Sequence, residues 1–170
     1  MFHFKKLTPT LFRTTEKEWM IQIEKANGEI FASHYRQVLD RGKKSIKKQC
    51  DKNLYTYALT QKENPDLASA ILEISHACPT AEAPWLKLLA INIAPSFDAV
   101  YTPDSRVLAK IVATAITESF ELTFTDCVSE QLKVYCATPF SIEFVEGVCS
   151  GIKNFDGVNF STSGNWFVIK

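Results

Sequence analysis

The sequence predicts an α+β domain built on a mixed central sheet, with helices on both faces. The clearest observation is the segment Trp85–Ile93 (WLKLLAINI), which is apolar at nearly every position, as a central strand covered on both faces is. An amphipathic helix is expected over residues 105–118 and a further strand over 131–137. Since strand, helix and strand follow one another, the two strands are expected to run parallel. The length of 170 residues fits a single domain, 1–170.

The first fifty residues are predicted to form a short strand and two helices. The segment 2–4 (FHF) alternates in polarity, which indicates a strand. Thr15 and Glu18 have the spacing of a capping box, so a helix is expected to begin at Thr15 and to end at Gly28. A second helix is predicted from an apolar stripe at helical spacing, formed by Phe31, Tyr35, Val38 and Leu39. Gly42 is expected to break or kink this second helix.

From residue 53 the pattern changes to that of strands. Residues 54–60 and 70–78 are strand-like, and the polar linker 61–66 contains a proline, as a hairpin loop often does. Successive side chains of a strand point to opposite faces, so Glu73 is expected on one face and His76 on the other.

Two threonine–proline pairs mark the later helices. Thr102-Pro103 precedes the helix at 105–118, and Thr138-Pro139 precedes the last helix. Each pair offers a capping hydroxyl, followed by a residue whose missing N–H needs no partner. The buried side of the last helix is expected to carry Phe140, Phe144 and Val148. A final strand pair is predicted at 158–160 and 166–169, around a turn at Gly164.

Composition excludes several classes of protein. No apolar run approaches the ~20 residues of a membrane span. Residues 1–6 lack the apolar core of a signal peptide, so a cytoplasmic protein without a membrane segment is expected. The five cysteines are scattered without a CxxC pair, and the three histidines have no paired spacing. Reduced thiols are therefore expected, rather than a disulfide framework or a metal site.

Charge is unevenly distributed along the chain. Residues 1–52 contain 12 Lys or Arg and 6 Asp or Glu, whereas residues 53–170 contain 7 and 13. The basic excess is concentrated between residues 36 and 52. This segment is expected to face an acidic macromolecule or substrate, and a plain solvated helix face is the alternative interpretation.

The order of these elements resembles that of the GNAT superfamily of N-acetyltransferases. The resemblance spans nearly the whole chain and includes the segments WLKLLAINIAP, QLKVYCA and TPFSIEFVEGV, the last of which is similar to the family's penultimate helix. It implies that the two parallel strands splay apart and that acetyl-CoA or another acyl-CoA lies in the gap. The cofactor-binding residues that it implies are Ile91, Asn92, Ile93, Arg106 and Lys110. The loop 95–110, which corresponds to the family's glycine-rich cofactor loop, contains no glycine, so we expect a divergent member that binds CoA weakly.

The resemblance also suggests catalytic groups. The family often uses a tyrosine of the penultimate helix as general acid, but Phe144 and Val145 occupy that region, and Tyr135 is the nearest phenol along the chain. Glu73 or His76 is the candidate general base. Structural roles for Tyr135 and His76 are the alternative interpretation.

Two functions remain open at this point. The first is a divergent N-acyltransferase that moves an acyl group from acyl-CoA to an amine, and the second is a catalytically inactive GNAT-like domain that binds another molecule. Nucleic-acid binding through the basic segment is a third hypothesis. It has less support, since Tyr35 is the only aromatic residue interleaved there.

Overall fold

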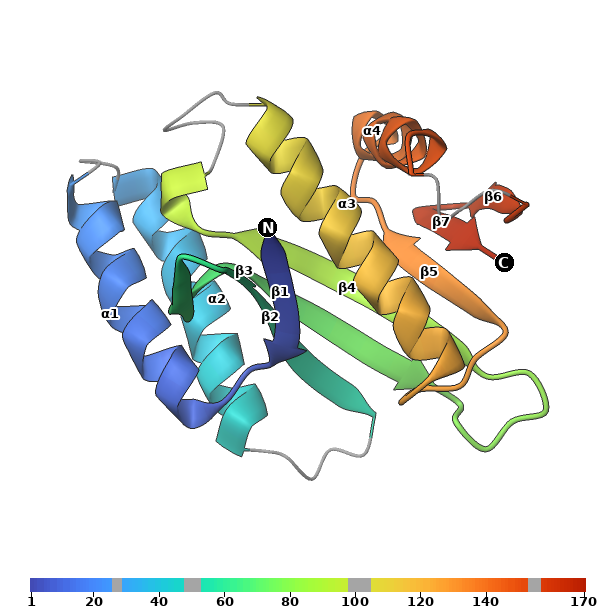
Figure 1. Ribbon diagram of the computed structural model, residues 1–170, viewed down its shortest axis with the longest axis horizontal. Coiled ribbons are helices and arrows are strands. Elements are labelled where there is room, and N and C mark those ends of the chain that lie inside the picture. Colours follow the sequence, from blue (N-terminus) through green and yellow to red (C-terminus); the bar gives the residue numbers. More distant parts are fainter. Residues whose placement is uncertain (26–28, 48–52, 98–104, 153–156) are drawn as a thin grey trace.

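The computed structural model describes residues 1–25, 29–47, 53–97, 105–152 and 157–170. Within them the chain forms one seven-stranded sheet and four α-helices (Figure 1). The strands are β1 (Phe2–Lys6), β2 (Leu54–Gln61), β3 (Asn64–Ala77), β4 (Trp85–Ile93), β5 (Gln131–Tyr135), β6 (Phe160–Ser163) and β7 (Trp166–Ile169). The helices are α1 (Pro9–Lys25), α2 (Glu29–Lys47), α3 (Ser105–Glu121) and α4 (Pro139–Ser150). The predicted helix stop at Gly28 and the predicted cap at Thr102-Pro103 lie outside the described residues.

The order of strands in the sheet is β1-β2-β3-β4-β5-β7-β6, with β4 at the centre. The strands β4 and β5 run parallel, and the other neighbouring strands pair antiparallel. The predicted α+β class and the predicted parallel pair are both confirmed.

Helices cover the two faces of the sheet unequally. On one face, a buried apolar cluster joins α3 and α4 to strands from β2 to β7, and it includes Leu72, Leu88, Ile111, Leu132, Val145 and Phe167. On the other face, α1 and α2 lie side by side over the first strands, with Trp19, Tyr35, Leu39, Ala58 and Ile71 in the core (Figure 1). Among the described residues, this second cluster contains none from β5, β6 or β7. Only the first half of the sheet is therefore packed against helices on both faces.

The prediction that the first helix begins at Thr15 is wrong. The helix begins at Pro9, where Thr8 Oγ1 accepts the N–H of Leu11 at 3.2 Å. Thr15 lies inside the helix and is buried, and its Oγ1 accepts the N–H of Ala68 in β3 at 3.1 Å. The Trp19 indole N–H donates to the Ala68 carbonyl at 3.0 Å. Thr15 thus holds the helix on the sheet instead of capping it.

Gly42 does not end the second helix, which continues from Glu29 to Lys47. A Cβ atom at Gly42 would lie 3.0 Å from Cε2 of Phe12 in α1. The glycine therefore allows α1 and α2 to approach closely at this point.

The cap of α4 is as predicted, and Phe144 and Val148 pack on the core as predicted, but Phe140 does not. Thr138 Oγ1 accepts the N–H of Ser141 at 3.2 Å, and Pro139 opens the helix. Phe140 is 75% exposed, whereas Val145 is buried. The two residues are five positions apart, which turns them about 140° from each other around a helix of 3.6 residues per turn.

The hairpin between β2 and β3 is tighter than the linker predicted at 61–66. The strands reach Gln61 and Asn64, which pair with each other, so the turn consists of Lys62 and Glu63. Pro65 lies inside β3, in the irregular stretch between the pairs Gln61–Asn64 and Thr60–Ala68, where it has no pairing partner in β2.

The central strand β4 contains a one-residue bulge at Leu89. Two consecutive residues of β3 pair with Leu88 and Ala90, so Leu89 is the extra residue. Before the bulge the even-numbered residues of β4 pack toward α3, and after it Ile91 and Ile93 do. The bulge therefore turns Asn92 toward the face of α1 and α2.

Candidate functional site

The strands β4 and β5 separate halfway along β4. They pair from Trp85 to Leu88, and β4 then continues to Ile93 with no further β5 partner in the described chain. The opening is a cavity of about 200 Å³, lined by Leu88, Ala90, Ile91, Val112, Val134, Tyr135, Cys136, Ser141, Phe144 and Val145. The splay that the family resemblance implies is present, with the bulge of β4 at its edge.

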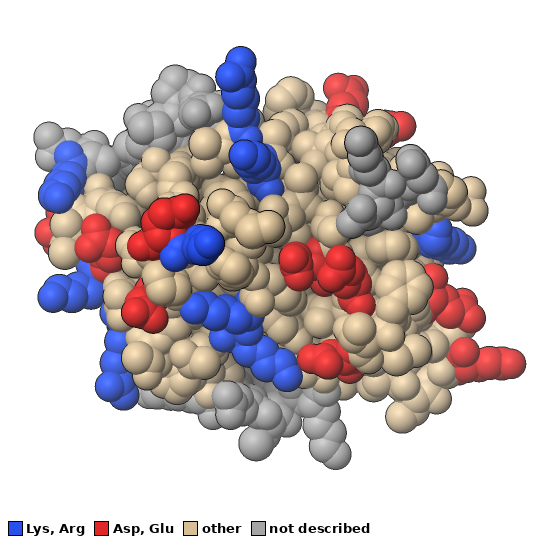
Figure 2. Space-filling model, viewed as in Figure 1, with Lys and Arg blue, Asp and Glu red and all other residues tan. Residues whose placement is uncertain are grey.

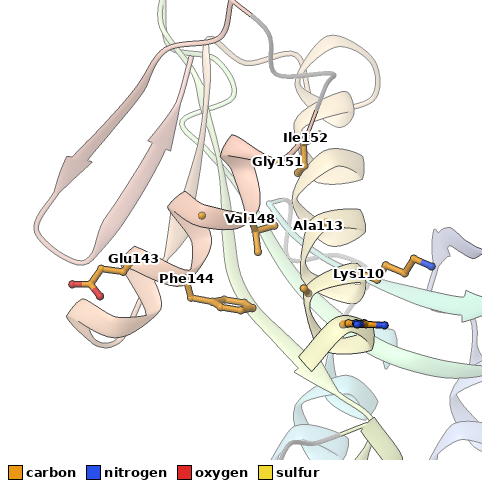
Figure 3. A pocket seen from close by; sticks show the side chains of 10 residues that line it. Lys110, Ala113, Glu143, Phe144, Val148, Gly151 and Ile152 are labelled. Atoms are coloured by element: carbon orange, nitrogen blue, oxygen red, sulfur yellow. The ribbon is translucent and has the colours of Figure 1, made fainter. Parts of the chain in front are cut away.

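A groove of about 600 Å³ runs between α3 and α4. It is lined by Arg106, Ala109, Lys110, Ala113, Glu143, Phe144, Gly147, Val148, Gly151 and Ile152. Phe144 lines both hollows, and Figure 3 shows it pointing from α4 toward α3. The groove and the opening between the strands are therefore neighbours that share one aromatic wall.

The middle of α4 leaves this groove open. A Cβ atom at Gly147 would meet nothing within 4 Å. A glycine inside a helix costs about 1 kcal/mol relative to alanine, and here no close neighbour requires it. The space that Gly147 leaves belongs to the groove.

Two of the predicted cofactor-binding residues line the groove and one lines the cavity. Arg106 and Lys110 come from the start of α3, where Figure 2 shows basic side chains at the upper edge of the molecule. In Figure 3 the ammonium group of Lys110 points away from α4, so its aliphatic stem forms the wall. Ile91 lines the cavity, whereas Ile93 packs on the apolar cluster below α3.

Tyr135 lies at the mouth of the cavity. It is the last residue of β5, is 45% exposed, and packs edge-on against Trp166 of β7 with ring centroids 5.3 Å apart. Of the three predicted catalytic residues, it is the one that borders this opening.

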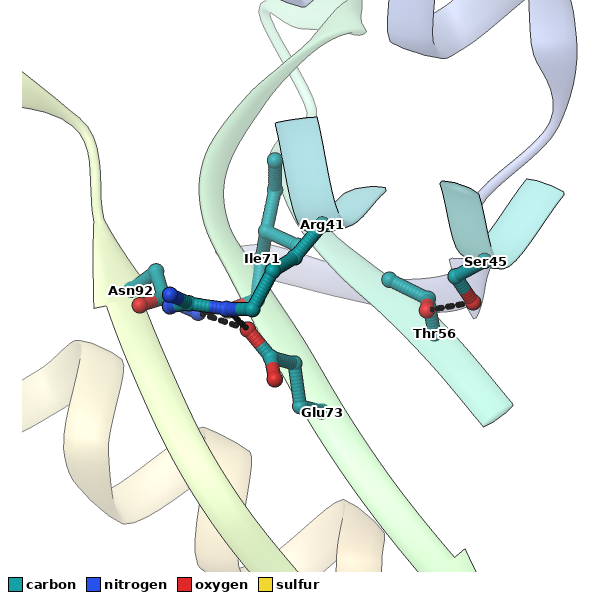
Figure 4. A network of polar contacts seen from close by, with 6 residues as sticks. All are labelled: Arg41, Ser45, Thr56, Ile71, Glu73 and Asn92. Atoms are coloured by element: carbon teal, nitrogen blue, oxygen red, sulfur yellow. Dashed lines mark hydrogen bonds and ion pairs between the residues drawn. The ribbon is translucent and has the colours of Figure 1, made fainter. Parts of the chain in front are cut away.

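Glu73 and Asn92 meet on the opposite face of the sheet. Glu73 Oε1 accepts Nε–H of Arg41 in α2 at 3.0 Å and an amide N–H of Asn92 at 3.2 Å (Figure 4). The same amide group donates to the Ile71 carbonyl at 3.2 Å. The Asn92 side chain therefore binds protein groups on this face, and Glu73 is held between a strand and a helix. Sequence reasoning had no signal for Arg41 as the partner of Glu73.

His76 lies near the C-terminal end of β3, three residues beyond Glu73. It pairs with Leu86 near the start of β4 and is nearly buried. Its Nε2 has no hydrogen-bond partner among the described residues, and neither hollow includes His76 in its described lining. As predicted from strand alternation, its face is the one opposite Glu73.

Cys136 lines the cavity but is not poised as a nucleophile. It is buried, and its Sγ lies 3.8 Å from the Val134 carbonyl. Burial raises the pKa of Cys136 above its ordinary value, so the unreactive thiol form persists at neutral pH.

The basic segment is partly described. The exposed cations of α2 are Arg36, Arg41, Lys43 and Lys44. Arg41 bonds Glu73, and Lys43 Nζ lies 3.8 Å from Glu16. Tyr35 is buried in the core, so it offers no aromatic surface beside these charges. Lys48 and Lys52 lie outside the described residues.

No family model matches the sequence, and no curated protein matches it. Solved structures match in fold. A mutant of the AtaT toxin bound to the C-terminus of its antitoxin AtaR is 12% identical, with 99% of this chain and 90% of that chain covered and a TM-score of 0.53. A GNAT family acetyltransferase from Brucella melitensis, in complex with acetyl-CoA, is 9% identical over 100% and 87% of the chains, with a TM-score of 0.50.

A third similar structure is the PaiA N-acetyltransferase of Thermoplasma acidophilum in complex with coenzyme A. It is 11% identical over 99% of this chain and 97% of that chain, with a TM-score of 0.48. The chain thus has a GNAT-like fold, and at such identities the likeness concerns the fold alone.

The described residues contain neither a membrane-spanning helix nor a cluster of metal ligands. No helix there is long and apolar enough to cross a membrane. Nor does that part of the chain bring three His, Cys, Asp or Glu side chains together as metal ligands.

Proposed function

We propose that the chain is a divergent N-acyltransferase that transfers an acyl group from acyl-CoA to an amine. The observation that carries this proposal is that two hollows are adjacent: the α3–α4 groove and the opening between β4 and β5 both have Phe144 in their walls. An acyl-CoA would lie along the groove, with Arg106 near its phosphates, the aliphatic stem of Lys110 against its side and the thioester at the opening.

The chemistry would use groups on both sides of the opening. The amine nitrogen attacks the thioester carbonyl carbon, and the carbon–sulfur bond breaks. Backbone N–H groups of β4 beyond its pairing with β5 would stabilise the oxygen that becomes negative. Tyr135 would protonate the departing thiolate, because it borders the cavity.

Glu73 would remove the proton from the attacking amine. Glu73 pairs across the sheet with Ala90, which lines the cavity. The Glu73 carboxylate lies on the face of the sheet opposite α3. An amine that enters from this side would meet Glu73, directly or through one water. Arg41 and Asn92 would act as positioning residues, since both bind Glu73 Oε1.

The test is binding of acetyl-CoA, followed by thermal unfolding and calorimetry. A ligand that binds only the native state raises stability by RT ln(1 + [L]/Kd), which is about 2.7 kcal/mol at 100 times Kd. Millimolar acetyl-CoA is expected to raise the melting temperature, and Arg106→Ala is expected to remove much of that shift.

Gly147 supplies a sharper pair of variants. Gly147→Leu fills the groove and is expected to abolish binding of acetyl-CoA, whereas Gly147→Ala adds one methyl group and is expected to retain most of it. Both should fold at least as stably as the parent, because a Cβ atom there meets no neighbour within 4 Å. Unchanged binding by Gly147→Leu would reject the groove as the acyl-CoA site.

A catalytically inactive GNAT-like binding domain is the alternative proposal. It is supported by Phe144, which stands in α4 where the family often places its general acid. This alternative predicts no release of free CoA in the presence of amines, whether or not acetyl-CoA binds. Tyr135→Phe distinguishes the two, because it should lower turnover while leaving acetyl-CoA affinity nearly unchanged.

A further inference from the structure

One half of the sheet presents charged and aromatic side chains on the face that α1 and α2 leave uncovered. We call this surface the lysine–aromatic face, and it consists of Trp85 and Lys87 of β4, Lys133 and Tyr135 of β5, and Trp166 of β7. All five alternate with buried residues of the α3 side, such as Leu86, Leu132 and Phe167. They are partly exposed, and Tyr135 is the most exposed of them.

The two lysines of this face lie directly opposite each other. Lys87 pairs with Lys133 across the parallel strands. Like charges at directly opposite positions destabilise a sheet, so this pair lowers stability. Within the described chain, neither lysine makes an ion pair with a carboxylate. Glu73, on the neighbouring strand, is bound instead to Arg41.

Each lysine rests on an indole ring. Lys87 Nζ lies 5.4 Å from the ring centroid of Trp166, and Lys133 Nζ lies 4.7 Å from that of Trp85. Tyr135 packs edge-on against Trp166. Cations and flat rings therefore alternate across three strands, which is the combination that binds phosphates and stacks unpaired bases.

Hydroxyl groups extend this row on both sides. Lys87 pairs with Ser75 of β3, and Lys133 pairs with Val168, whose partner in β6 is Ser161. A serine hydroxyl can donate to or accept from a ribose 2′-hydroxyl. Five strands spaced about 4.8 Å apart span roughly 19 Å, which is wider than the four-stranded sheets that stack two or three bases.

We propose that the lysine–aromatic face binds a segment of single-stranded RNA. Bases stack on Trp166 and Tyr135, phosphates lie on Lys87 and Lys133, and the exposed cations of α2 attract the strand from the side. Tyr135 belongs both to this face and to the cavity between β4 and β5, so a bound strand would pass the mouth of that cavity. The binding itself does not depend on acyl transfer.

The experiment is a titration of the full chain with an unstructured, fluorescently labelled oligoadenosine RNA of about ten nucleotides, within the site sizes common for such proteins. Lys87→Gln/Lys133→Gln should weaken binding by about tenfold or more. It should also lower the slope of log affinity against log salt by about 1.4, since each released phosphate contact contributes about 0.7 on a single strand. The variant should fold with stability close to that of the parent, because the loss of two cation–π contacts is offset by the removal of a like-charge pair.

The matched control is Lys17→Gln/Lys25→Gln, which removes the same charge from exposed positions of α1. This control should change RNA affinity by no more than about twofold relative to the parent, since protein charges that do not contact the bound strand contribute only through screened, long-range attraction. Trp166→Ala should weaken binding about tenfold, and Trp166→Phe should restore most of it, because phenylalanine also stacks. RNA should quench the fluorescence of the parent, whereas Trp19 is buried on α1 and cannot report the contact.

Several results would overturn the proposal. These are absence of RNA binding, equal losses in both lysine double variants, and equal affinity for single-stranded DNA of the same sequence. A dimer that dissociates on Lys87→Gln/Lys133→Gln, without RNA binding, would assign the face to a second copy of the chain instead. None of these results bears on acetyl-CoA binding in the α3–α4 groove, which is measured without RNA.

Discussion

The two faces of the sheet differ in how far their apolar contacts extend. Beneath α3 and α4 the buried cluster reaches from β2 to β7, whereas beneath α1 and α2 it ends near Ala94 at the end of β4. The continuous face holds the three buried thiols and the hollow between the strands. The interrupted face leaves Lys87, Lys133 and Trp166 partly exposed. The difference indicates that stability resides where both helical layers are present, and that side chains beyond the second layer stay partly accessible at the surface.

Among the substitutions that test this difference, Trp19→Ala should have the largest effect on stability. Trp19 is fully buried under α1 and donates to the Ala68 carbonyl, so its truncation should lower the free energy of unfolding by about 3–5 kcal/mol. Trp166→Ala, on the uncovered half, should cost about 1 kcal/mol, as exposed contacts of this kind do. Urea denaturation measures both. Equal losses would contradict the assignment of stability to the doubly covered half.

Stability at alkaline pH tests how well the thiols are buried on the face of the sheet under α3 and α4. Burial, and to a smaller extent the nearby Cys136, raises the pKa of Cys149 to about 12. The unfolded chain loses this proton near pH 8.5, so the stabilisation is complete below that pH and is lost as pH rises toward 12. The free energy of unfolding should fall by up to about 1.4 kcal/mol per pH unit from this thiol alone.

Cys127, Cys136 and Tyr57 act in the same direction, because burial raises each of their pKa values. Unfolding by urea at pH 8, 9 and 10 checks the slope, and Cys149→Ala should make it less steep. A stability that does not change over this range would show that the thiols are reached by water.

The helix glycines provide a smaller, paired test. Gly42→Ala should destabilise the protein by about 1 kcal/mol, because the strain of overpacking against Phe12, about 1–3 kcal/mol, exceeds the gain in helix propensity of about 1 kcal/mol. Thermal unfolding in the absence of ligand measures the change. A stabilised variant would mean that Phe12 moves aside and that α1 and α2 are not closely fitted here.

Gly147→Ala should have the smallest effect and the opposite sign. With no atom within 4 Å of the added Cβ, the helix gains about 0.5–1 kcal/mol of stability. The same thermal unfolding measurement applies. A destabilised variant would indicate that α3 and α4 lie closer together in solution and that the groove is narrower.

Much of the fold could be predicted from local patterns. The apolar run of β4 and the Thr138-Pro139 cap depend on neighbouring residues, and both were identified correctly. The start of α1 was missed because Thr15 and Glu18 have the spacing of a capping box, but the Thr15 hydroxyl binds Ala68, which lies 53 residues further along the chain. A hydrogen bond between residues far apart in the sequence leaves no local pattern from which it could be predicted.

The candidate site shows the same limit. Tyr135, Arg106 and Ile91 were selected by resemblance, and the structure places each on the wall of a hollow. The ion pair of Arg41 with Glu73 joins a helix to a strand 32 residues away, and strand register alone brings Lys87 beside Lys133. The hypothesis of nucleic-acid binding considered aromatic residues only within the basic segment, whereas those of the lysine–aromatic face come from three other strands.

The bulge at Leu89 holds one residue more than the pairing with β3 requires. Deletion of Leu89 would remove the bulge and keep the pairing on both sides of it, because Ala90 would still lie opposite Glu73 and Asn92 opposite Ile71. Asn92 would therefore stay on the face of α1 and α2, and Ile91 would stay under α3. An inserted residue has no such place, since it must either enlarge the bulge or turn the following side chains to the opposite face. This stretch of β4 should therefore tolerate the loss of one residue more readily than the gain of one.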